Sequence, residues 1–218
     1  MPLTHNQPHP PQQSIGLMSD PKPEPSRSIC VFCGSSPGND PAFQAAAAEL
    51  GRALVARGYG LVYGGASVGL MGLVANTVLE AGGRVIGVMP DFMVAKEIAH
   101  RGLSELKITT SMHERKDVMA SLSHGFVALP GGFGTLEEFF EVVTWAQLGL
   151  HAKPCGLLNV NGYYDSLLRF FDTAVERRLL GTSTRELALV ASDVNGLLDR
   201  MQAYTAPAVS KWIDTART

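Results

Sequence analysis

A glycine-rich stretch near the middle of the chain, residues 129–138 with the sequence LPGGFGTLEE, could bind a phosphate group. An apolar run precedes it, and a helical pattern from Leu136 to Leu148 follows. Backbone N–H groups at a helix N-terminus face such a ligand, and the helix dipole attracts negative charge. Thr135 and Glu138 are expected in the first helical turn, pointing towards the ligand. They also match a T-x-x-E capping box, so a purely structural role for Glu138 is the alternative.

A second stretch, SMHERK, places two cations near the start of another expected helix. Ser111 and Glu114 form a capping box of their own. Adjacent cations in the second turn oppose the helix dipole, so Arg115 and Lys116 are favoured there when an anion or a carboxylate compensates them. Two interpretations stay open. The pair either forms an anion site, or it is exposed to solvent or paired with Glu114 or Asp117.

Apolar runs and helical patterns alternate along the chain, which predicts the elements that position these residues. Strands are expected at residues 28–33, 60–63, 84–89, 106–109, 126–129, 153–159 and 188–190, and helices at 41–57, 73–81, 111–123, 136–148, 163–180 and 193–203. Asp40 and Ser192 are the expected N-caps of the first and last helices.

This alternation predicts an α/β fold, a Rossmann-like doubly wound and mostly parallel sheet with helices on both faces. Right-handed crossovers bring the carboxyl ends of all strands to one edge, where ligands bind in such folds. The glycine loops at residues 34–38, 64–72 and 130–134 are therefore expected to converge there.

Length and composition indicate one domain, residues 28–204, between a disordered Pro-rich tail at 1–27 and a loosely packed tail at 205–218. The net charge of −2, without a Lys/Arg run, argues against nucleic acid as a partner. No apolar run reaches membrane-spanning length and no signal-peptide pattern is present, so no membrane partner and a cytoplasmic location are expected.

The pair Cys30 and Cys33 has the spacing of a redox or metal motif. Both lie in an expected strand, where residues three apart face opposite sides of the sheet. No second Cys/His pair completes a zinc site, and His5 and His9 lie in the tail. We therefore expect small core residues and no metal.

Five stretches together resemble the LOG ("lonely guy") family: PGGFGTLEE at 130–138, MHERK at 112–116, YGGASVGLMG at 63–72, CVFCGSS at 30–36 and TWAQLGLHAKP at 144–154. The resemblance covers residues 28–203. It implies hydrolysis of the N-glycosidic bond of an N6-modified AMP, giving free base and ribose 5-phosphate without a cofactor. It also implies a homodimer with the site near the subunit interface. Many members carry the label "lysine decarboxylase". The sequence does not support this activity, because no glycine loop is accompanied by an obvious pyridoxal-binding lysine.

By position, the resemblance implies that Arg115 and Glu138 form the catalytic pair. It also implies a substrate-binding set that comprises Ser35, Gly64, Gly65, Gly69, Met112, Lys116, Gly131, Gly132, Gly134 and Thr135. Breaking the bond to C1′ builds positive charge on the ribose. Glu138 can stabilise that charge or orient water, whereas Arg115 stays protonated and acts electrostatically.

Two positions depart from the family pattern. Ala66 stands where a glycine is common, which would cost on the order of 1 kcal/mol if that residue needs a positive φ. His124 stands where an aspartate is usual, and a surface or hydrogen-bonded role is expected for it. Trp145 and Tyr163 are expected in the core or an interface rather than stacked on a base.

Competing functions stay open. One is an AMP nucleosidase with little preference for modified bases, and another is a non-catalytic nucleotide sensor. An oxidoreductase is disfavoured because the GxGxxG fingerprint is missing.

Overall fold

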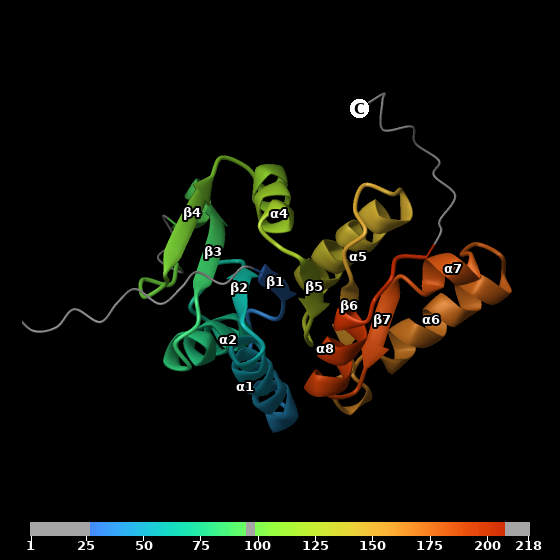
Figure 1. Cartoon of the computed structure of the whole chain (residues 1–218), viewed down its shortest axis with the longest axis horizontal. Helices are drawn as coiled ribbons and strands as arrows, with labels where there is room; N and C mark the ends of the chain where they lie inside the picture. The colour runs from blue at the N-terminus through green and yellow to red at the C-terminus, as the bar shows by residue number, and fades with distance from the viewer. Residues whose placement is uncertain (1–26, 95–98, 208–218) are drawn as a thin grey trace, which may run out of the picture.

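The computed structural model describes residues 27–94 and 99–207 and contains a seven-stranded parallel sheet (Figure 1). The order across the sheet is β4-β3-β2-β1-β5-β6-β7. The strands are β1 (Arg27–Phe32), β2 (Tyr59–Tyr63), β3 (Val85–Pro90), β4 (Glu105–Thr109), β5 (Gly125–Ala128), β6 (Cys155–Leu158) and β7 (Ala188–Ala191). The chain winds outwards in one direction from β1 to β4 and in the other from β5 to β7, which confirms the doubly wound prediction.

Helices cover both faces of the sheet (Figure 1). They are α1 (Pro41–Ala56), α2 (Gly69–Glu80), α3 (Asp91–Val94), α4 (Met112–Ser121), α5 (Phe133–Gln147), α6 (Asp165–Glu176), α7 (Thr182–Arg185) and α8 (Val194–Gln202), with a 3-10 turn η1 (Val160–Gly162). Apolar side chains of α1, α2 and α8 pack on one face, and those of α4, α5 and α6 pack on the other.

The strands are apolar on both sides because helices bury both sheet faces. Cys30 lies in the core beneath α4 and α5, whereas Cys33 lies in the core beneath α1 and α2. Both thiols are buried and free, which confirms the expectation of small core residues that face opposite sides of the sheet. Burial raises the pKa of both thiols.

Several predicted boundaries move. The helix expected at 163–180 is shorter, because α6 begins only at Asp165 and ends at Glu176, and Arg178 beyond it adopts a positive φ of 59°. Asp193, not Ser192, caps α8 by accepting a hydrogen bond from the Gly196 N–H at 2.8 Å. Arg27 already belongs to β1, so the expected tail ends one residue earlier.

The predicted tails lie largely outside the described residues, as do His5 and His9. In the described part of the chain, no helix is long and apolar enough to cross a membrane.

Candidate active site

The three glycine loops converge at the carboxyl edge of the sheet, as predicted. The Gly34 N–H donates to the Pro130 carbonyl at 3.1 Å, and the Leu70 N–H donates to the Gly34 carbonyl at 3.1 Å. Gly69 has a φ of +59°, and a Cβ there would lie 2.3 Å from the carbonyl carbon of Ser35. Only a residue without a side chain allows the backbones of two loops to come this close.

A pocket of about 360 Å³ opens where these loops meet. It is lined by Gly34, Ser35, Ser36, Gly38, Asn39, Phe43, Leu70, Pro130, Gly131, Gly132 and Tyr163. Of the predicted binding residues, Ser35, Gly131 and Gly132 line it. Thr135 lies buried behind the loop, where a Cβ at Gly131 would meet its Oγ1.

Helix N-termini at this edge differ in how they are capped. Asp40 caps α1 and Ser111 caps α4, with side-chain oxygens 2.9 Å and 3.1 Å from backbone nitrogens. The N-caps of α2 and α5, Val68 and Gly132, make no side-chain cap hydrogen bond. N–H groups in the first turn of a helix have no intrahelical acceptor. In α2 the Leu70 N–H is already bound to the Gly34 carbonyl, so α5 is the helix whose first turn offers free donors and partial positive charge to an anion.

The capping-box interpretation of Thr135 and Glu138 is wrong. α5 begins at Phe133, so Thr135 already lies inside its first turn and Glu138 lies in its second. Glu138 therefore cannot bond the N-cap N–H, and its carboxylate is free for another role.

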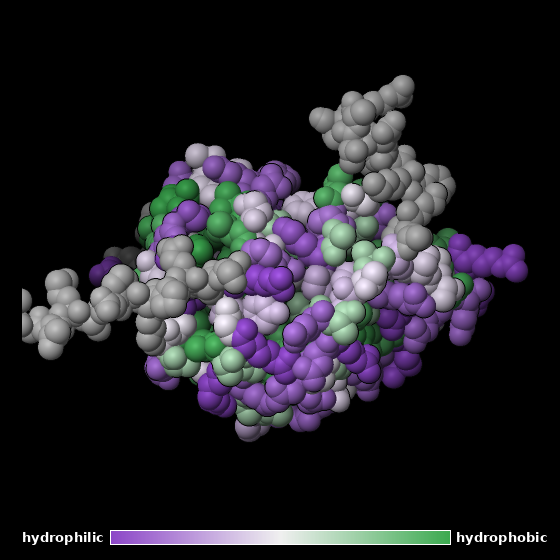
Figure 2. Space-filling model, in the orientation of Figure 1, coloured by the Kyte–Doolittle hydropathy of each residue, from purple (hydrophilic) through white to green (hydrophobic). Residues whose placement is uncertain are grey.

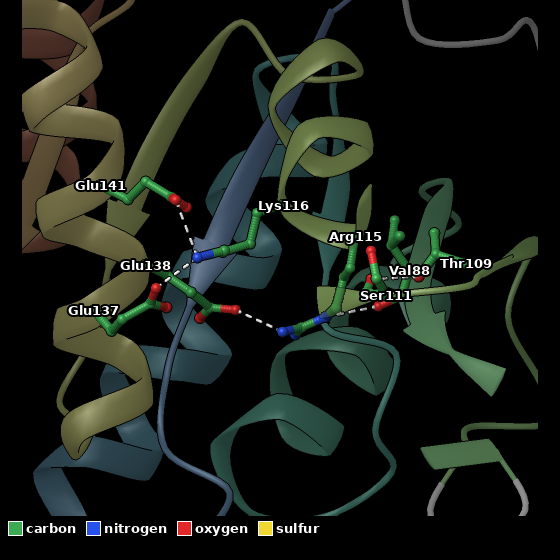
Figure 3. A network of polar contacts seen from close by, with 8 residues as sticks. All are labelled: Val88, Thr109, Ser111, Arg115, Lys116, Glu137, Glu138 and Glu141. Atoms are coloured by element: carbon green, nitrogen blue, oxygen red, sulfur yellow. Dashed lines mark hydrogen bonds and ion pairs between the residues drawn. The ribbon is translucent and has the colours of Figure 1, made fainter. Parts of the chain in front are cut away.

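Arg115 and Glu138 form an ion pair that joins α4 to α5 (Figure 3). The Arg115 Nη1 and Glu138 Oε1 atoms are 2.9 Å apart, and the two side chains are 10% and 12% exposed. The Arg115 Nε also donates to the Val88 carbonyl at 3.1 Å. Gly64 makes room for the guanidinium, because a Cβ there would lie 2.4 Å from Nη2. The structure thus brings together the two residues predicted as a catalytic pair.

Burial raises the pKa of Glu138, and the nearby charge of Arg115 partly offsets this effect. The carboxylate is held by one oxygen and by a cation that cannot release its proton. Such a group can stabilise positive charge that develops next to it or orient a water molecule.

Lys116 lies beside this pair and reaches α5 as well (Figure 3). Its Nζ is 2.5 Å from Glu137 Oε1 and 3.0 Å from Glu141 Oε1. Burial alone would lower the pKa of Lys116, but the hydrogen bonds with both carboxylates outweigh it and raise the pKa. The pairing with Glu114 or Asp117 that the sequence left open is not formed: Glu114 accepts from the N–H and hydroxyl of Thr110 at 2.7 and 2.6 Å.

Other predicted residues lie around this centre. Gly65 packs against Met89 and Leu106, and its carbonyl accepts from the His100 N–H at 2.9 Å. Met112 is 38% exposed at the start of α4, and Gly134 follows Phe133 in the first turn of α5.

The two departures from the family pattern cause no visible strain. Ala66 is buried without a positive φ and bridges Ala99. His124 is exposed before β5, where its Nδ1 accepts from the Ser28 N–H at 3.3 Å. This confirms the expected surface role of His124.

Sequence reasoning missed Tyr163 as a pocket residue. It was expected in the core or an interface, yet it is 45% exposed, lines the pocket and donates its hydroxyl to the Gly131 carbonyl at 2.7 Å. The Asn161-Gly162 turn signal after a predicted strand could have placed it at the ligand edge.

Among residues 27–94 and 99–207, no group of three His, Cys, Asp or Glu side chains could hold a metal ion.

The free space at Gly132 gives a direct test of the anion site. A Cβ at Gly132 would meet nothing within 4 Å, so Gly132→Ala is expected to change stability by less than about 1 kcal/mol. The added methyl group would stand in the pocket before the α5 N-terminus and raise the KM for a 5′-phosphorylated substrate by about 10-fold. Urea unfolding and steady-state kinetics measure the two effects.

Gly69→Ala is the matched contrast. It forces a side chain into the Ser35 backbone at a positive φ, and we expect it to destabilise the fold by about 2–3 kcal/mol. A wild-type KM in Gly132→Ala would place the phosphate elsewhere.

The fold and this site define the class of the protein: a Rossmann-like α/β protein with convergent glycine loops beside a buried arginine–glutamate pair. A family model described as "Possible lysine decarboxylase" matches residues 71–201. The chain is 53% identical to the probable cytokinin riboside 5′-monophosphate phosphoribohydrolase LOGL6 of Oryza sativa subsp. japonica, over 82% of this chain and 72% of that protein. It is 49% identical to the cytokinin riboside 5′-monophosphate phosphoribohydrolase LOG3 of Arabidopsis thaliana, over 82% and 83%.

Solved structures share the fold. The molybdenum cofactor carrier protein of Chlamydomonas reinhardtii aligns with a TM-score of 0.60 at 24% identity, over 81% of this chain and 97% of that one. The molybdenum cofactor binding protein of Rippkaea orientalis aligns with a TM-score of 0.61 at 19% identity, over 81% and 96%. These likenesses concern the fold alone. By its sequence, the chain belongs to the LOG family.

Proposed function

We propose that the chain is a phosphoribohydrolase that cleaves the N-glycosidic bond of a cytokinin riboside 5′-monophosphate, an N6-modified AMP. The products are the free base and ribose 5-phosphate. The observation that supports this most is the Arg115–Glu138 ion pair, whose guanidinium lies against Gly64 of one of the converging glycine loops. The names of relatives about 50% identical to this chain support the same activity.

Substrate binding starts from the phosphate in this proposal. The free N–H groups at the α5 N-terminus and the loops at 34–38 and 130–132 hold the 5′-phosphate. Binding energy gained there, away from C1′, positions the ribose for reaction. Ser35 and Met112 are assigned to the walls of the nucleotide site.

Glu138 carries the chemistry at C1′. As the bond to the base breaks, positive charge builds on the ribose ring, and an ionised carboxylate next to it lowers the barrier. Arg115 binds Oε1 of Glu138, which leaves Oε2 for a ribose hydroxyl or for the attacking water. Arg115 keeps the carboxylate ionised and fixes its direction.

Lys116 positions the helix that bears Glu138, and this differs from the lining role that the sequence suggested. Its two carboxylate partners, Glu137 and Glu141, flank Glu138 on α5. The bridge fixes α5 against α4, so that Arg115 and Glu138 face each other.

A pyridoxal-dependent decarboxylase, which the family model's description names, does not fit the described lysines. Such a lysine must lose its proton to form a Schiff base. Lys116 has a raised pKa, and Lys107 pairs with Glu105 at 2.6 Å. Burial lowers the pKa of Lys153, but its ammonium group is engaged by the Ala120 carbonyl, to which it donates at 2.8 Å. None of the three lines the glycine-loop pocket.

Substrate comparison tests the proposed function. Purified protein is incubated with N6-isopentenyl-AMP, AMP and CMP in parallel, and free base and ribose 5-phosphate are measured. We expect faster release from the prenylated nucleotide than from AMP and none from CMP. Equal or faster release from AMP would make the protein a general AMP nucleosidase. Binding without release from any nucleotide would make it a sensor.

We further propose that two copies associate through the apolar edge of the sheet. Figure 2 shows hydrophobic side chains gathered over β3 and β4. At this edge, Phe92 of α3 and Ile108 of β4 are each 51% exposed. Exposed apolar patches of this kind mark interaction sites. Light scattering measures the oligomeric state.

The cytoplasmic location stays a prediction from the sequence.

A further inference from the structure

Two consecutive tyrosines hold the carbonyl groups on either side of Pro130. The hydroxyl of Tyr164 donates to the Leu129 carbonyl at 2.6 Å, and that of Tyr163 donates to the Gly131 carbonyl at 2.7 Å. Burial raises the pKa of Tyr164, which keeps this hydroxyl a donor. Both ends of the turn that leads into α5 are therefore fixed by side chains from a different part of the chain.

The segment that carries these tyrosines is itself tightly constrained. Asn161 and Gly162 adopt positive φ angles of 49° and 72°. Asn159 accepts from the Tyr164 N–H at 2.7 Å, and the Asn161 amide donates to Asp40, the N-cap of α1, at 3.0 Å. A non-glycine residue keeps a left-handed conformation where its surroundings impose it. The turn after β6 thus joins β6, α1 and the 129–131 turn into one support.

The direction of the Gly131 carbonyl controls the donors of the loop. A planar trans peptide points its C=O and its N–H in opposite directions. With the Gly131 carbonyl held by Tyr163, the Gly132 N–H is turned the other way. Gly132 is the N-cap of α5, so the same contact sets where the free N–H groups of the first turn begin.

We propose that Tyr163 is a positioning residue for the 5′-phosphate, which orients the donors of residues 132–135 through its hydrogen bond to Gly131. The inference rests on the proposed function, in which a nucleotide 5′-phosphate occupies the glycine-loop pocket. Tyr163 acts through the loop, because its single hydroxyl proton is already donated to Gly131. Its ring packs edge-on against Phe43 and Tyr164, with centroid distances of 5.3 and 4.8 Å, so the hydroxyl is held in place.

Tyr163→Phe tests this role, since it keeps the ring packed and removes only the hydroxyl. We expect the KM for N6-isopentenyl-AMP to rise by about 3- to 10-fold, the range for one lost hydrogen bond. The kcat is expected to stay within about twofold, because the phosphate contact serves ground state and transition state alike. Calorimetry should give the same loss for AMP and for ribose 5-phosphate, with no change for adenosine, which has no phosphate.

Tyr59→Phe is the matched control, because Tyr59 begins β2 at the opposite edge of the sheet. This variant should leave KM, kcat and the calorimetric affinities unchanged. A wild-type affinity of Tyr163→Phe for ribose 5-phosphate, or equal weakening of AMP and adenosine, would refute the positioning role. If the wild-type protein hydrolyses none of the nucleotides, the proposed function fails. The comparison of AMP with adenosine still decides the role of Tyr163 in that case.

Discussion

Glu138→Gln is expected to lower kcat for N6-isopentenyl-AMP by about 10³-fold, with a small change in KM. Glutamine has nearly the same shape, so the contact with Arg115 can be kept through the amide oxygen. The negative charge that stabilises the ribose in the transition state is lost. Steady-state kinetics measure the loss, and calorimetry with ribose 5-phosphate should show that binding of the phosphate is retained.

Glu137→Gln is the matched control for this variant. Glu137 precedes Glu138 on α5, but its side chain is 55% exposed and pairs with Lys116 instead of Arg115. Neutralising it removes one carboxylate from the same helix without touching the ion pair. We expect a decrease in kcat of less than about 5-fold. A Glu138→Gln protein with near wild-type kcat would refute the assignment of Glu138 as the catalytic carboxylate.

Local sequence signals were sufficient for most of the fold. Asp40 followed by Pro41 predicts the start of α1, and the structure confirms both the cap and the first residue. Gly58 ends that helix with a φ of +75°. Apolar runs predict all seven strands, because burial on both faces leaves few polar residues in them.

The boundary errors have local causes. T-x-x-E at 135–138 resembles a capping box, but the backbone turns into α5 already at Gly132, where no side chain marks the start. Ser192 and Asp193 are both good caps, and sequence alone does not rank them. The periodic pattern from Tyr163 onwards placed the start of the long helix two residues too early, because residues 159–164 form a turn that depends on contacts with Asn159 and Asp40.

The site itself depends on contacts between distant residues, which no local pattern encodes. In the sequence, the nearest carboxylate to Arg115 is that of Glu114, but adjacent residues on a helix do not face each other. It reaches Glu138 because α4 and α5 pack side by side on one sheet face. Lys116 reaches Glu137 and Glu141 for the same reason. The sequence therefore identifies the charged residues that are candidates for the site, and the packing of α4 and α5 on the sheet determines which of them come into contact.

Arg115→Met is expected to lower kcat by about 10²-fold or more and to change how the protein depends on pH. Burial already raises the pKa of Glu138, and Arg115 opposes that effect. Without the cation, the pKa rises further. Activity needs ionised Glu138, so the acid limb of the profile of log kcat against pH should move to higher pH than in the wild type. Kinetics between pH 5 and pH 9 measure the shift.

The free energy of unfolding of the Arg115→Met variant should also depend on the protonation of Glu138. In contrast to the activity, it should decrease as the pH rises. When the folded pKa of a carboxyl exceeds its unfolded value, the folded state binds more protons, and the free energy of unfolding falls as pH rises through the folded pKa. Arg115→Met should therefore lose up to about 3 kcal/mol relative to wild type at pH 8 and less at pH 5. The double variant with Glu138→Gln has no buried unpaired charge, so it should recover most of the free energy of unfolding that Arg115→Met loses at pH 8. An unshifted acid limb together with a pH-independent loss would show that Arg115 does not control Glu138.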